Sequence, residues 1–180
     1  MPRSSNKDAA RHRQQIVEAA SELFRERGID GVSVPEIMGS AGLTHGGFYR
    51  HFDSKEQLAA LACGRAVAGQ GRELEALRDE RALLDGYLSS GHRDDRAHGC
   101  PVAALSGEVA RAAPDSPVRA ELTAGVNGFA DGIAALGGHD RDKALARMSL
   151  LVGALVLSRA TEGAPVSDEI LSAARAALER

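Results

Sequence analysis

Side chains that bind phosphate groups are concentrated in one short stretch of this chain. The segment Thr44–Phe52 reads THGGFYRHF, so it holds a hydroxyl, two imidazoles, a phenol and a guanidinium. Such groups, and the amides at helix N-termini, are common ligands of nucleic-acid phosphates. Phe48 and Phe52 are four residues apart, so on a helix they share one face and can anchor it inward. The residues expected to face outward are His45, Gly46, Tyr49 and Arg50.

A second group of reactive side chains surrounds Cys100. This cysteine stands just before a proline at a predicted helix start, with Arg93 and Arg96 close in sequence. A helix N-terminus and nearby cations lower the pKa of a thiol, so a sensor thiol is one interpretation. A small buried residue that lets the helix start against its neighbour is the other. His92, His98 and Cys100 match no standard zinc spacing, and we predict no metal site.

The sequence contains no motif typical of an enzyme active site. The nucleophile elbow, the zinc-protease motif, the P-loop and the dinucleotide fingerprint are all missing. We therefore expect no catalytic residues and no cofactor.

The composition predicts one modest globular chain. Its 180 residues are 43% hydrophobic but only 3% aromatic, without tryptophan, so the core must be built mostly of Ala, Leu and Val. The net charge is −3, yet residues 1–13 hold Arg3, Lys7, Arg11 and Arg13 against Asp8 alone. A local basic patch is sufficient for phosphate contacts.

Cysteine content and hydropathy favour a soluble cytoplasmic protein. The two cysteines, Cys63 and Cys100, are too few for a disulfide scaffold. The N-terminus is polar, and no apolar run approaches the roughly 20 residues that cross a bilayer.

The elements that position the polar stretch follow from capping and periodicity. We expect a disordered arm over residues 1–10 and a helix from Arg13 to Gly28. Ser33 and Glu36 have the spacing of a capping box, which predicts a short helix that ends at about residue 42. Thr44 is expected to cap the next helix, which runs to about residue 51.

The rest of the chain also has helical periodicity, and no segment predicts a strand. We expect a long helix from Ser54 to about Leu77, a short helix near residues 83–88 and a polar loop over 91–99. Further helices are predicted over about 100–112, 118–136 and 140–161. A last helix is expected to be capped by Ser167.

The segment Thr44–Phe52, followed by Ser54-Lys55-Glu56-Gln57-Leu58, resembles the TetR family of bacterial transcriptional regulators. The resemblance covers roughly residues 12–60. It implies an all-α fold with an N-terminal three-helix helix-turn-helix DNA-binding domain over residues 1–52. It also implies a C-terminal helical domain for ligand binding and dimerisation over residues 53–180.

The resemblance also implies which residues contact operator DNA. The positions that match are Ser33, Thr44, His45, Gly47, Tyr49, His51 and Lys55, mostly as phosphate contacts, with His45 and Gly47 nearer the bases. We add Arg50 as a further contact, and the cations of the N-terminal arm as minor-groove or phosphate contacts. Gly46-Gly47 replaces the more usual small polar pair, and two glycines offer little base readout.

Family regulators are homodimers whose last two long helices form a four-helix bundle across the dimer. The effector pocket is expected among the helices that start at Ser54, Ser116 and Asp140. Its expected lining residues are Cys100, Phe129, Met148 and Leu151. The run His98–Leu105 is similar to a segment of a subgroup in which some members respond to reactive electrophiles, quinones or flavonoid-like aromatics.

The sequence therefore predicts a ligand-responsive, DNA-binding regulator, a repressor that releases its operator when a small molecule binds. Two alternatives stay open: an architectural DNA-binding protein without an effector, and a small helical enzyme.

Overall fold

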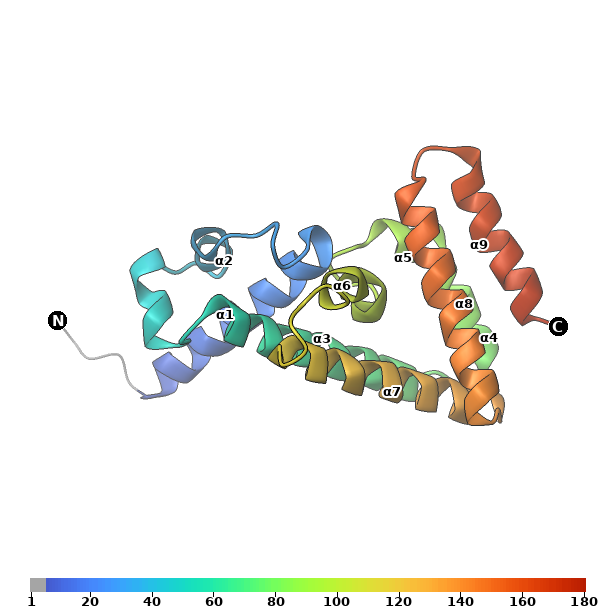
Figure 1. The fold of residues 1–180 in the computed structure, drawn as a ribbon, viewed down its shortest axis with the longest axis horizontal. Helices are drawn as coiled ribbons and strands as arrows, with labels where there is room; N and C mark the ends of the chain where they lie inside the picture. Colours follow the sequence, from blue (N-terminus) through green and yellow to red (C-terminus); the bar gives the residue numbers. More distant parts are fainter. Residues whose placement is uncertain (1–5) are drawn as a thin grey trace.

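A computed structural model describes residues 6–180, and all regular secondary structure in that range is helical (Figure 1). The α-helices are α1 (Asn6–Arg27), α2 (Val34–Ser40), α3 (Lys55–Glu75), α4 (Glu80–Tyr87), α5 (Ser90–Asp94), α6 (Pro101–Val109), α7 (Pro117–Gly137), α8 (Arg141–Ala160) and α9 (Pro165–Leu178). The short 3₁₀ helix η1 (His45–Arg50) lies between α2 and α3. The predicted all-α fold is confirmed.

Helix α1 begins earlier than the sequence analysis predicted. Residues 6–10 are helical, so the expected disordered arm is wrong for that part of the chain. Asp8 lies in the first turn, where a carboxylate is favoured, and it pairs with Arg11 at 2.9 Å. Arg3 lies outside the described residues. Gly28 ends the helix with a positive φ of 81°, a conformation that glycine adopts without strain.

The predicted capping box of α2 is confirmed. The Ser33 side chain accepts a hydrogen bond from the Glu36 amide, and the Glu36 carboxylate accepts one from the Ser33 amide. Thr44 occupies the N-cap position of η1, but its side chain makes no capping hydrogen bond. The element after it is a 3₁₀ helix rather than the expected α-helix. Two adjacent glycines, each costing an α-helix about 1 kcal/mol relative to alanine, account for this difference.

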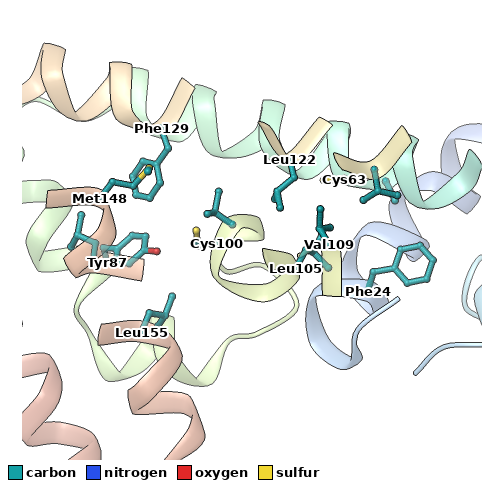
Figure 2. Packing of buried hydrophobic residues seen from close by; sticks show 14 of the residues in the cluster. Phe24, Cys63, Tyr87, Cys100, Leu105, Val109, Leu122, Phe129, Met148 and Leu155 are labelled. Atoms are coloured by element: carbon teal, nitrogen blue, oxygen red, sulfur yellow. The ribbon is translucent and has the colours of Figure 1, made fainter. Parts of the chain in front are cut away.

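Long helices form the body of the molecule. Helices α3 and α7 lie side by side along their length, α8 and α9 form an adjacent pair, and α6 crosses between α1 and α7 (Figure 1). One buried cluster runs from Phe24 near the N-terminal helices to Phe129 and Leu155 in the body (Figure 2). No helix within residues 6–180 is long and apolar enough to cross a membrane.

Two details of the body differ from the predictions. The polar segment expected to be a loop contains α5, because the Ser89 side chain accepts a hydrogen bond from the His92 amide and caps a short helix. Ser167 does not cap α9, which begins two residues earlier at Pro165. The buried Ser167 hydroxyl instead donates a hydrogen bond to the Ser158 carbonyl at 2.8 Å, which joins α9 to α8.

Candidate nucleic-acid interface and cavity

Buried aromatic side chains anchor helix η1 to the core, and one further aromatic ring is exposed to solvent. Phe48 and Phe52 are completely buried, as predicted, whereas Tyr49 is 73% exposed. The Tyr49 ring meets Phe48 edge-on, with 5.2 Å between ring centroids. The tyrosine is thus held at its base, and its hydroxyl end points away from the core.

The outer surface of η1 combines polar side chains with bare backbone. Thr44, His45 and Arg50 are exposed. A Cβ atom placed on Gly46 would meet nothing within 4 Å, and one on Gly47 would meet only the Met38 Cε at 3.6 Å. The two glycines are therefore not required by packing inside the protein. Their effect is a bare backbone that another molecule can approach closely.

Arg13 has a structural role that the sequence analysis did not predict. Its guanidinium donates to the His51 carbonyl and lies 4.5 Å from the centroid of the Phe52 ring. This cation therefore ties α1 to the end of η1 and does not belong to a free arm, while its contact with DNA stays a prediction. Burial, followed by the nearby His12, Arg13 and Arg50 cations, lowers the pKa of the His51 imidazole.

Ser33 and Lys55 flank η1 in different ways. The Ser33 hydroxyl is already engaged, since it donates to the Glu36 carboxylate at 2.6 Å. This bond and the one from the Ser33 amide lower the pKa of Glu36 to about 2. Lys55 is the first residue of α3, whose N-cap Ser54 accepts from the Gln57 amide at 3.1 Å. Lys55 thus stands in the first turn of a helix, where the backbone amides favour a bound anion.

Comparisons with known proteins identify the family. The model of bacterial regulatory proteins of the tetR family matches residues 16–62. An uncharacterised HTH-type transcriptional regulator from Mycobacterium tuberculosis is 32% identical over 165 residues, which cover 82% of this chain and 84% of that protein. The chain belongs to the TetR family.

Other relatives of this TetR-family protein match over shorter segments. The HTH-type transcriptional repressor KstR2 of Rhodococcus jostii is 33% identical over 101 residues, and AcnR of Corynebacterium diphtheriae is 36% identical over 95. The chain spans about half the length of these two curated relatives. The crystal structure of E. coli NemR in its reduced form has a TM-score of 0.76 at 20% identity, with 94% of this chain and 95% of that chain covered. It shows the same fold.

The TetR-family body contains a cavity of about 440 Å³ between α1, α3, α4 and the start of α6. Its buried, mostly apolar lining includes Ala66, Leu74, Leu83, Tyr87, Cys100 and Phe129. Its charged lining residues are half-exposed or exposed, and two of them, Glu18 and Arg65, form an ion pair.

The cavity overlaps the expected pocket only in part, since it is lined by α3 and by Phe129 of α7 but by no residue of α8. Cys100 and Phe129 line it, as expected, but Met148 and Leu151 do not. Both of those side chains belong to the buried core on α8. The cavity instead faces α1 and α4, because the small residues of α3 on that side leave space. The lining residues that sequence reasoning missed include Tyr87 and Gln70, whose positions depend on tertiary packing.

Hydrogen bonds fix the polar groups around Cys100. The Gln70 amide donates to the Cys100 sulfur at 3.2 Å, and the Ala103 amide does so at 3.5 Å. The His92 ring joins the Tyr87 carbonyl (2.8 Å) to the Cys100 amide (3.1 Å). Burial is the main cause that lowers the pKa of His92. Within residues 6–180, no group of three His, Cys, Asp or Glu side chains is arranged to hold a metal ion.

Helix α6 connects the cavity to the N-terminal helices. Cys100 caps its first turn at the cavity wall. At its other end, the Glu108 carboxylate accepts hydrogen bonds from the Ile29 amide at 2.8 Å and the Asp30 amide at 3.0 Å. These two amides belong to the turn between α1 and α2, so α6 contacts both regions directly.

Proposed function

We propose that this protein is a transcriptional repressor that binds operator DNA as a homodimer and releases it when a small molecule enters the cavity. The proposal rests on the exposure of Tyr49. Its side chain is largely exposed, whereas the neighbouring aromatic side chains of Phe48 and Phe52 are completely buried. A large exposed aromatic on a rigid element indicates a binding surface rather than packing. In a helix-turn-helix, the second helix is the one that enters the major groove.

In this proposal, residues 1–52 bind DNA and residues 53–180 bind the effector and form the dimer. Thr44, Tyr49 and Arg50 contact phosphates, and Lys55 adds a contact from the N-terminus of α3. His45 and the open backbone at Gly47 approach the base edges. Two further contacts are His51 and Ser33, the latter once its hydroxyl turns away from Glu36.

The exposed apolar residues of the last two helices support the dimer. Leu150, Val156 and Leu157 on α8, and Val166 on α9, are large apolar side chains exposed to solvent. Such a surface is typical of a homodimer interface. We assign the dimer contact to α8 and α9.

The cavity supports an effector over a purely architectural role. A volume of about 440 Å³ lies in the range of small-molecule pockets. Ligand-driven movement of α6 would reach the α1–α2 turn through Glu108. A coupling of about 1–3 kcal/mol between the two sites changes DNA affinity roughly 5–150-fold. The repressor names of KstR2 and AcnR support repression over activation.

The decisive experiment is a gel shift on DNA that flanks the protein's own gene. Tyr49→Ala is expected to weaken binding at least about tenfold, because each protomer loses a contact. Tyr49→Phe, which keeps the ring, is expected to lose less. Both variants should keep the wild-type helicity and Tm, since the side chain is exposed. Wild-type affinity of Tyr49→Ala would refute the proposed interface.

The same assay separates reversible from covalent effectors. A quinone entering the cavity meets the Cys100 sulfur, which lines it. If a quinone releases the wild-type protein but not Cys100→Ser from DNA, the effector acts through the thiol. Equal release of both proteins rules out thiol chemistry.

A further inference from the structure

One buried polar group in the cavity wall lacks a partner. The Tyr87 residue is only 6% exposed, and its hydroxyl is the one buried side-chain nitrogen or oxygen within residues 6–180 that makes no hydrogen bond. Figure 2 shows this hydroxyl directed toward the Cys100 sulfur. After burial, the Cys100 thiol raises the pKa of Tyr87 through its charge and through a weak side-chain contact with the hydroxyl, but that contact does not have the geometry of a full hydrogen bond. A buried hydroxyl without a partner is costly and requires an explanation.

The polar neighbours of Tyr87 are already satisfied. A carbonyl can only accept, so the His92 Nδ1 donates to the Tyr87 carbonyl, and Nε2 is left to accept from the Cys100 amide. Both nitrogens of this neutral ring are therefore in use. The Cys100 sulfur accepts from two donors, as described above. Among the fully buried side-chain nitrogen and oxygen atoms of residues 6–180, the Tyr87 hydroxyl is thus the one donor left without an acceptor.

The surroundings of that hydroxyl suit an uncharged molecule. Phe129 packs against the Tyr87 ring with 5.6 Å between centroids, and Leu74 and Leu83 complete an apolar wall. The charged groups of the lining are half-exposed or exposed, and the half-exposed Arg25 guanidinium already donates to the Ser21 and Gly99 carbonyls. The Arg159 guanidinium acts electrostatically on Tyr87, but it donates to the His92 and Arg93 carbonyls and does not line the cavity. A charge placed at the buried end would therefore lose its hydration without an ionic partner in the lining there.

We propose that the Tyr87 hydroxyl donates a hydrogen bond to a carbonyl oxygen of an uncharged, largely apolar effector, of the class of cyclic ketones. The inference rests on the proposed function, since it names the ligand chemistry of the proposed effector cavity. The ring system of the ligand lies against Phe129, Leu74 and Leu83. Its carbonyl oxygen accepts the hydrogen bond that the Tyr87 hydroxyl does not make within the protein.

A matched pair of probes tests this hydrogen bond. 1-Tetralone carries a carbonyl, and tetralin is the hydrocarbon of nearly the same shape. Their dissociation constants would be measured by ligand-detected NMR with the wild-type protein and with Tyr87→Phe. We expect the variant to bind 1-tetralone about five- to tenfold more weakly and tetralin with unchanged affinity.

Two measurements distinguish a ligand contact from a structural role. Without ligand, Tyr87→Phe should be at least as stable as the wild-type protein, because it removes an unsatisfied hydroxyl. If the Tyr87 hydroxyl had a structural role, Tyr87→Phe would have a lower Tm than the wild-type protein and would bind both probes more weakly. Gly69→Leu serves as the control for location, since a Cβ there meets only the Arg72 Nη2, at 3.9 Å, and the longer side chain fills the cavity. Gly69→Leu should bind both probes more weakly than the wild-type protein does.

Three outcomes would overturn the inference: equal affinity of 1-tetralone for wild type and Tyr87→Phe, a fall in Tm of the variant, or no binding by any ketone of a series from 1-indanone to fluorenone. Binding of flanking DNA is measured on the same samples. It distinguishes a failure of the ligand assignment from a failure of the proposed function. If DNA binds while the ketones do not, the ligand assignment alone is wrong. If no DNA binds, the proposed function is wrong.

Discussion

The two tyrosines of this chain lie in opposite environments, and each carries part of the functional account. Tyr49 is exposed on η1, whereas Tyr87 is buried in the cavity wall. The outward direction of Tyr49 could be predicted from the sequence, because Phe48 and Phe52 are four residues apart and occupy the inner face. The unpaired hydroxyl of Tyr87 could not, since it results from contacts between segments distant in sequence.

The His92 imidazole provides a pH test at the scale of one residue. Burial lowers its pKa from the usual value near 6.5, so the folded protein holds the ring neutral while the unfolded chain takes up a proton. Its contribution to stability is complete above about pH 6.5 and falls as the pH drops toward the lowered pKa of the folded state. Unfolding by urea should therefore become easier between about pH 7 and pH 5.

His92→Gln is the matched variant for this prediction. It has no titrating group at this position, so the change in its unfolding midpoint between the two pH values should be smaller than that of the wild-type protein. Identical pH dependence in the two proteins would show that His92 is not held neutral by the fold.

At the scale of elements, hydrophobic periodicity and capping residues predicted where helices form, because both signals are local. Ser33 with Glu36 and the anchors of η1 are examples. The helix type of η1 and the first residue of α9 were harder to predict from the sequence. Two glycines weaken an α-helix at Gly46, and Ser167 resembles a cap but is used between α8 and α9.

The contact between α6 and the α1–α2 turn carries the prediction at this scale. In Glu108→Gln, one of the two acceptor oxygens becomes an amide donor, so one of the hydrogen bonds from Ile29 and Asp30 is lost. Hydrogen exchange of these two amides should accelerate at least about tenfold, the effect of losing one charge-assisted bond. DNA affinity should change with it.

Arg111→Gln is the control for this prediction, since that exposed side chain lies near the same turn. It should leave the exchange of both amides unchanged. Exchange rates in Glu108→Gln equal to those of the wild type would show that α6 does not hold the turn.

At the scale of the whole molecule, the sequence predicted the family and the helical architecture but located the cavity only in part. Cavities are the volumes that side chains leave empty, and a one-dimensional pattern of apolar residues does not show which of them meet. Met148 and Leu151 have the same apolar character as the lining residues, yet they fill the core on α8.

The central claim is that two copies of η1 occupy successive major grooves of one duplex. Hydroxyl-radical footprinting on DNA flanking the gene tests it most directly. We predict two protected patches on one face of the duplex, with centres one helical turn, about 34–36 Å, apart. Leu157→Arg, which places a charge on the exposed apolar face of α8, should give monomers and lose the paired pattern. A single protected patch, or a paired footprint that persists unchanged in Tyr49→Ala, would contradict the account.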